Sequence, residues 1–153
     1  MTVKTRDARF EWSDDFLLGH GPMDDVHQEF VEIVCAMQEA PDQDVAPLLE
    51  RFASHAKAHF ESEDAWMAET DFPARACHID EHAAVLKSVH AIQRRVANGD
   101  SQAARRLATE LRAWFPGHAQ HLDSALAHWM CKLRLGGKPV VLRRRADATR
   151  HPS

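Results

Sequence analysis

The residues best suited to chemistry in this sequence are histidines and carboxylates that lie four positions apart. The chain holds 11 histidines and no tyrosine in 153 residues. His59 and Glu63 form one such pair, and His78 and His82 form another. Side chains four residues apart lie on the same face of a helix, about 5 to 6 Å apart at Cβ, so each pair can address one metal cluster. The two spacings therefore predict a metal centre built on helices.

Three further candidates lie on or near the apolar face of an expected helix. His27 falls between Val26 and Phe30, and His118 continues an apolar line, so both are expected to point into the core. Asp123 comes five positions after His118, which places the two side chains roughly 140° apart on a regular helix. Bringing Asp123 into the same site requires a kink or a widened turn after residue 117, a feature often found at functional sites.

A single buried histidine is more often a hydrogen-bonded core residue than a metal ligand. Seven candidates on four expected helices change that balance. Without a metal, their burial leaves many polar atoms to satisfy and two carboxylates to neutralise, each at a cost on the order of several kcal/mol. The predicted metal ligands are His27, His59, Glu63, His78, His82, His118 and Asp123. His55, one turn before His59, is expected to support these ligands from outside, whereas His121 and His128 are expected to face solvent.

Apolar residues recur every three or four positions in four segments, which is typical of amphipathic helices. The first segment runs from Met23 to about Ala40, and Asp44 is the expected cap of the second, with Pro47 in its first turn. The later breaks are expected at 70–73 and 98–99, and a kink is expected at 116–117. The absence of an alternating strand pattern completes the case for an all-α, up-down-up-down four-helix bundle over residues 23–135.

The residues on either side of the bundle are expected to differ from it. Residues 1–22 are predicted to form an N-terminal arm that packs across the helices, and residues 136–153 a flexible basic tail. The formal charge of −4 hides a division, because residues 1–131 hold 12 basic and 22 acidic side chains and residues 132–153 hold 7 and 1. A solvated tail is the favoured interpretation; a protein partner of the tail is the alternative, and nucleic acid is not the expected partner.

The sequence carries no signal for secretion or for insertion into a membrane. No apolar stretch follows the charged residues near the N-terminus, so no signal peptide is expected, and no run has the length of a membrane span. Cys35, Cys77 and Cys131 match neither a disulfide framework nor a paired zinc motif. We therefore expect a cytoplasmic protein with reduced thiols, and we expect Cys77 to be a small buried helix residue.

The number and type of candidate ligands bear on the identity of the metal. Structural zinc takes about four protein ligands and catalytic zinc about three, so seven candidates imply two metal ions. Five imidazoles with two carboxylates suit redox-active iron. The order His-x-x-x-Glu differs from the Glu-x-x-His motifs of carboxylate-rich di-iron bundles.

The order of these motifs along the chain resembles the hemerythrin family, particularly its bacterial single-domain members. The similarity covers about residues 12–130. The motifs are Trp12, Asp24-x-x-His27, His59-Phe60-x-x-Glu63 with Met67, His78-x-x-x-His82, and Trp114-x-x-x-His118-x-x-x-x-Asp123. Each motif alone is weak, but their occurrence in this order, about one per expected helix, is specific. Leu126 is a departure, because many members have a tyrosine there.

The resemblance implies two non-haem iron ions joined by an oxo or hydroxo bridge. In that arrangement His78, His82 and His118 bind one iron, whereas His27 and His59 bind the other. Glu63 and Asp123 bridge the two. With about six ligands per iron, the second iron keeps one open position, where the family binds molecular oxygen reversibly.

The sequence leaves the use of such a site open. An oxygen carrier, store or sensor is the favoured prediction, and an enzyme is less favoured. The alternative is a di-iron enzyme or redox sensor that reacts with oxygen, peroxide or nitric oxide, although no second set of acid, base and substrate groups is evident. A third interpretation is a signalling module that acts through the basic tail. The sequence does not predict the oligomeric state.

Overall fold

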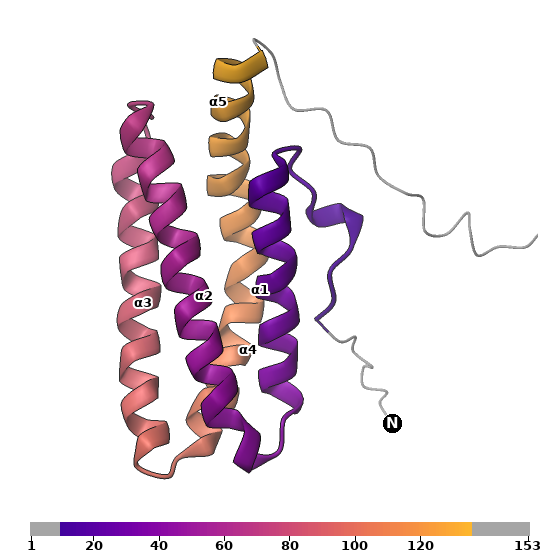
Figure 1. Ribbon diagram of the computed structural model, residues 1–153, viewed down its shortest axis with the longest axis vertical. Helices are drawn as coiled ribbons and strands as arrows, with labels where there is room; N and C mark the ends of the chain where they lie inside the picture. Colours follow the sequence, from indigo (N-terminus) through magenta and orange to yellow (C-terminus); the bar gives the residue numbers. More distant parts are fainter. Residues whose placement is uncertain (1–9, 136–153) are drawn as a thin grey trace, which may run out of the picture.

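The computed structural model describes residues 10–135, with side chains through residue 133. These residues form helices that run alternately up and down, as Figure 1 shows. The helices are α1 (Gly21–Glu39), α2 (Asp42–Glu69), α3 (Arg75–Ala97), α4 (Ser101–His118) and α5 (Ser124–Leu135), with the short η2 (Asp14–Phe16) before them and the π-helical η3 (Ala119–Asp123) between α4 and α5. The predicted all-α four-helix bundle is confirmed. Its four helical columns are α1, α2, α3 and a fourth made of α4, η3 and α5 in succession.

The helix ends follow from local chemistry, with one correction to the sequence-based boundaries. Asp100 caps α4 through a hydrogen bond that its side chain accepts from the backbone N–H of Ala103, and α3 ends before Gly99, whose φ of 100° suits glycine. The prediction that Asp44 caps the second helix was wrong. Pro41 is the N-cap, and Asp42 and Asp44 both lie in the first turn, where negative charge complements the helix dipole. Pro47 therefore lies in the second turn.

Apolar side chains fill the space between the four columns. Adjacent columns pack in the order α1, α2, α3, α4 and back to α1. One core cluster is centred on residues such as Phe30, Phe52 and Phe115, and a second one at the α5 end contains Met23 and Leu126. The metal-ligand candidates lie on these same four columns, so the helical packing sets their relative positions.

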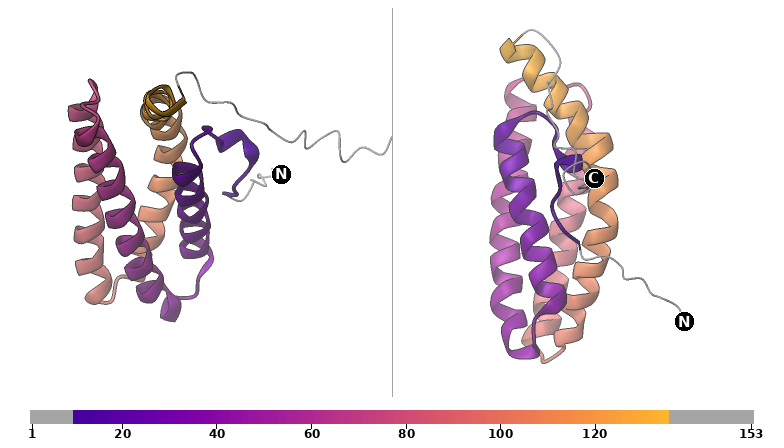
Figure 2. Two further views of the ribbon diagram at one scale, coloured as in Figure 1. Left: turned by 45° about the horizontal axis from the view of Figure 1, so that its top comes forward. Right: turned by 90° about the vertical axis from the view of Figure 1, so that its right-hand side faces the viewer.

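The described part of the N-terminal arm packs against the bundle, beside α1 in Figure 2. The ring of Phe10 lies 6.2 Å from that of Phe115, and the ring of Phe16 lies 5.4 Å from it. Asp24 of α1 accepts hydrogen bonds from the backbone N–H groups of Leu18 at 2.8 Å and Gly19 at 3.1 Å. The carboxylate thus fixes the chain where the arm enters the bundle.

Residues 1–9 of the predicted arm and the predicted basic tail, 136–153, lie outside the described residues. None of the helices within residues 10–135 is long and apolar enough to cross a membrane. The three cysteines form no disulfide. Cys77 is exposed, so the prediction of a buried residue was wrong: it lies on the side of α3 that faces away from the core.

Phe52→Ala should destabilise the protein far more than Leu133→Ala. Phe52 is fully buried in the larger core cluster, so its truncation leaves a cavity and should lower the free energy of unfolding by about 3–5 kcal/mol. Leu133 is 54% exposed and serves as the control, with an expected change of about 0.5 kcal/mol or less. Urea denaturation followed by circular dichroism measures both, and equal losses of stability would contradict the assigned core.

Candidate metal centre

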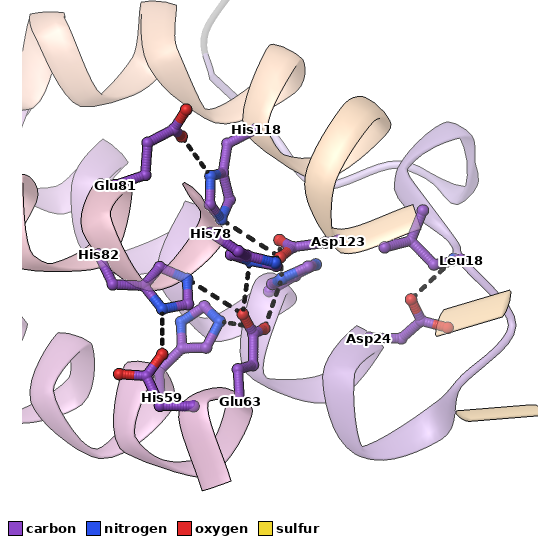
Figure 3. A network of polar contacts seen from close by, with 11 residues as sticks. Leu18, Asp24, His59, Glu63, His78, Glu81, His82, His118 and Asp123 are labelled. Carbon is purple, nitrogen blue, oxygen red and sulfur yellow. Dashed lines mark hydrogen bonds and ion pairs between the residues drawn. The ribbon is translucent and has the colours of Figure 1, made fainter. Parts of the chain in front are cut away.

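All seven predicted ligands come together in the interior of the bundle. Each is at most 5% exposed. They come from every column: His27 from α1, His59 and Glu63 from α2, His78 and His82 from α3, His118 from the end of α4 and Asp123 from η3. Figure 3 shows the imidazoles turned toward the two carboxylates. The structure therefore brings together in one place every residue of the predicted set.

The donor atoms fall into two groups that share one carboxylate. Within each group the candidate ligand atoms lie within 4.8 Å of one another. The larger group contains Glu63, His78, His82, His118 and Asp123, and the smaller contains His27, His59 and Glu63. Two adjacent positions for a cation follow from this arrangement.

Glu63 directs one oxygen atom toward each group. Its Oε1 lies 3.2 Å from Nε2 of His82 and 3.4 Å from Nε2 of His78. Its Oε2 lies 2.9 Å from Nε2 of His59 and 3.6 Å from Nε2 of His27. A carboxylate in this orientation can place one oxygen atom on each of two cations.

Asp123 divides its oxygen atoms in the same way. Its Oδ1 lies 2.9 Å from Nε2 of His78 and 3.2 Å from Nε2 of His118. Its Oδ2 lies 2.9 Å from Nε2 of His27. Asp123 therefore also contacts imidazoles of both groups.

The widened turn expected before Asp123 is present as η3. Its π-helical hydrogen bonding spans five residues, as in the bond from the backbone N–H of Ser124 to the carbonyl oxygen of Ala119. Because a π turn holds more residues than an α turn, His118 and Asp123 come close to one face although they are five positions apart. The turn follows Pro116, whose ring removes a helical N–H donor within α4.

The buried polar atoms of the site fit a cation better than they fit one another. Nε2 of His27, His78, His82 and His118, together with both oxygens of Asp123, make no well-directed hydrogen bond to any described residue, although their partners lie close. Buried polar atoms normally have such partners. Lone pairs that converge on a common centre without shared protons are what metal ligation requires.

Two carboxylates outside the seven candidates contact candidate imidazoles at Nδ1, the ring nitrogen that points away from Glu63 and Asp123. Nδ1 of His82 lies 2.8 Å from Oδ1 of Asp64, and Nδ1 of His118 lies 2.6 Å from Oε1 of Glu81. Trp114 donates an indole hydrogen bond of 3.2 Å to the same Glu81 oxygen. Such contacts orient an imidazole and make its other nitrogen a better ligand.

Sequence reasoning missed both of these carboxylates. Asp64 and Glu81 each adjoin a ligand in the sequence, and this was the only signal for them. The ring of His55 packs against that of His59, with 5.6 Å between the ring centroids. Its Nδ1 lies 3.4 Å from Oε1 of Glu29 on α1. His121 and His128 are exposed, as predicted.

The ionisation of the site reflects burial opposed by close ion pairs. Burial disfavours the charged imidazolium, but contacts with Asp123 and Glu63 outweigh it and raise the pKa of His27 and of His78 to about 9. Burial likewise disfavours the carboxylates, and the surrounding histidines nevertheless lower the pKa of Glu63 and of Asp123 below the ordinary range. In the absence of a metal, protons on the histidines supply the positive charge.

Comparison with known proteins agrees with this class of fold and site. The fold and site define a helical bundle with a buried cluster of His, Glu and Asp side chains that suits cations. The family model "Hemerythrin HHE cation binding domain" matches residues 19–129. The chain is 36% identical over 122 residues to a bacteriohemerythrin of Ralstonia nicotianae, covering 80% of this chain and 89% of that protein. No solved structure gives a significant match. The chain belongs to the hemerythrin family, and membership implies binding of non-haem iron.

Metal uptake by the metal-free protein should release protons at neutral pH. Because the pKa values of His27 and His78 are raised to about 9, both are protonated at pH 7 and must lose their protons to bind a metal. The affinity for Zn²⁺ should therefore rise from about pH 6 to about pH 9. Calorimetric titrations in two buffers with different heats of ionisation measure the protons released. Heats that do not depend on the buffer would contradict this prediction, and His90→Ala, at an exposed position, is the control.

Proposed function

We propose that this protein reversibly binds molecular oxygen at a non-haem di-iron centre and acts as an oxygen carrier, store or sensor. The observation that carries this proposal is the division of both buried carboxylates between two groups of imidazoles. A single cation would use only one side of each carboxylate, whereas two cations use all four oxygen atoms. Membership of the hemerythrin family supports iron as the metal.

The arrangement of donors supports an open position at one of the two metals. We assign His78, His82 and His118 to the first metal, and His27 and His59 to the second, with Glu63 and Asp123 bridging. With an oxo or hydroxo bridge and about six ligands per iron, the first position would be complete and the second would lack one ligand. Two ferrous ions held by these residues would supply the two electrons that reversible oxygen binding requires.

Apolar side chains pack against several of the candidate ligands. The ring of Phe60 stacks on that of His82 at 4.0 Å, and the ring of Phe115 meets that of His27 edge-on at 5.2 Å. Phe30 stacks on Phe115 at 4.9 Å. Leu126, at the position where many relatives have a tyrosine, is fully buried and adds no acidic group. A dry, apolar wall slows the loss of bound ligand to solvent acids, which is what reversible binding needs.

One observation favours a second candidate function, a di-iron enzyme or redox sensor for peroxide or nitric oxide. A cavity of about 450 Å³ lies between α1 and α2 and reaches His59. Its lining includes Glu29, Arg51 and His55, which are polar groups suited to small polar molecules. Such a cavity would bring peroxide close to His59, a candidate ligand of the second position. It does not supply a second set of catalytic acids and bases, so reversible oxygen binding is the function we favour.

Iron-loaded protein should contain about two iron ions per chain and should bind oxygen through repeated cycles. The ferrous protein, exposed to air and then deoxygenated, should gain and lose its charge-transfer bands reversibly. Asp123→Asn, which removes one bridging charge, should lower the iron content, while the exposed-site variant His90→Ala should behave as the wild type. Prompt oxidation that deoxygenation does not reverse would instead support the enzyme or sensor.

A further inference from the structure

We propose that the two metal positions have unequal affinities, with the position formed by His78, His82 and His118 filling first and holding its ion more tightly. This inference rests on the proposed two-metal site. It concerns the order in which the site is loaded and which ion it loses first. Three independent features of the described residues support it.

The first feature is the number of donors. Five side chains converge on the first position, whereas four reach the second, and both positions share Glu63 and Asp123. His78 and His82 belong to one rigid helix, α3, at a spacing that aligns them without rearrangement. His27 and His59 come from separate helices, so the second position depends on how α1 and α2 pack. A first ion therefore finds more ligands, already oriented, at the first position.

The second feature is the support behind the imidazoles. Asp64 and Glu81 hold His82 and His118 of the first position. In contrast, Nδ1 of His27 and of His59 has no hydrogen-bond partner among the described side chains and backbone. A carboxylate behind a ligating imidazole fixes its orientation and raises its basicity. Two of the three imidazoles at the first position have this advantage, and neither imidazole at the second does.

The third feature is the charge of the site. Glu63 and Asp123, both buried, provide two negative charges that the two positions share. The first divalent cation neutralises these charges. The second must enter a site that is already neutral, close to a like charge, in surroundings that screen poorly. Its binding is therefore weaker, even before the difference in ligand number is considered.

Unequal affinities make the second position the one that limits function. At low metal supply the protein holds a single ion at the position of His78, His82 and His118. Oxygen binding in the proposed function needs an electron from each of two ferrous ions, so it is acquired only when the second position fills. Oxygen binding would consequently follow the availability of iron, and the ion held by His27 and His59 would be the exchangeable one.

Anaerobic calorimetric titration of the metal-free protein with Co²⁺ tests this order. Co²⁺ accepts the same ligands as ferrous iron, and its binding can be measured without any reaction with oxygen. We expect two binding steps whose dissociation constants differ by at least about 10-fold, with the absorption of the cobalt ion differing between the first and second equivalents.

Single variants identify which position each step represents. His59→Ala should abolish the second step and leave the first dissociation constant unchanged. Glu81→Gln should weaken the first step by roughly 10-fold, because His118 loses a charged partner. Glu61→Gln is the matched control: Glu61 is an exposed residue of α2 that pairs with Lys57, and its substitution should change neither step. Circular dichroism checks folding, and Asp64→Asn, behind His82, replaces Glu81→Gln if that variant does not fold.

Two steps of equal affinity would overturn the inference, as would a first step weakened by His59→Ala but not by Glu81→Gln. These outcomes differ from a failure of the proposed function. If Co²⁺ binds in the expected order but the ferrous protein does not bind oxygen reversibly, the loading order stands and the oxygen-binding proposal fails. If the steps are equal and oxygen binds reversibly, only the loading order fails. Binding of one Co²⁺ in total would remove the two-metal premise and both proposals with it.

Discussion

The burial of two carboxylates among five imidazoles is the constraint on which the rest of this structure depends. Glu63 and Asp123 are at most 1% exposed, and a buried carboxylate is costly unless positive charge compensates it. Against the effect of burial, the neighbouring carboxylates raise the pKa of His27 and of His78 to about 9, so protons on these rings can provide that charge in the metal-free protein. Protons, however, leave many of the converging nitrogen and oxygen atoms without directed partners. Metal ligation by these residues would meet both the charge and the geometry.

The bundle meets this constraint by giving each helix a regular face and by altering only one turn. His59 and Glu63, and likewise His78 and His82, need nothing but an α-helix to share a face. Asp123 needs η3, in which a helix that is otherwise continuous from α4 to α5 takes a π turn. The wider turn brings Asp123 within 2.9 Å of both His27 and His78. Irregular geometry is thus confined to the point where ligation requires it.

The same distinction explains how much of the fold and site could be predicted. The four helices and the inward-facing histidines follow from apolar periodicity, and His27 was predicted from its apolar neighbours alone. Asp123 required either resemblance to a family or knowledge of the π turn, because regular geometry directs it away. Asp64 and Glu81 look like ordinary surface acids in the sequence; only the packing of α2, α3 and α4 shows that they contact imidazoles. Cys77 was misplaced because it adjoins the buried His78 in the sequence but lies on the exposed side of α3.

The donors are divided unequally between the two groups, and the proposed difference between the two metal positions rests on this division. α3 contributes two imidazoles, His78 and His82, to the larger group. The second position receives one imidazole each from α1 and α2, and the ring of Phe115 lies against that of His27. Because Phe115 also belongs to the main core cluster, the packing that stabilises the bundle also forms the apolar wall beside His27. Stability and the apolar surroundings of this imidazole therefore depend on the same side chains, and substitutions there alter both together.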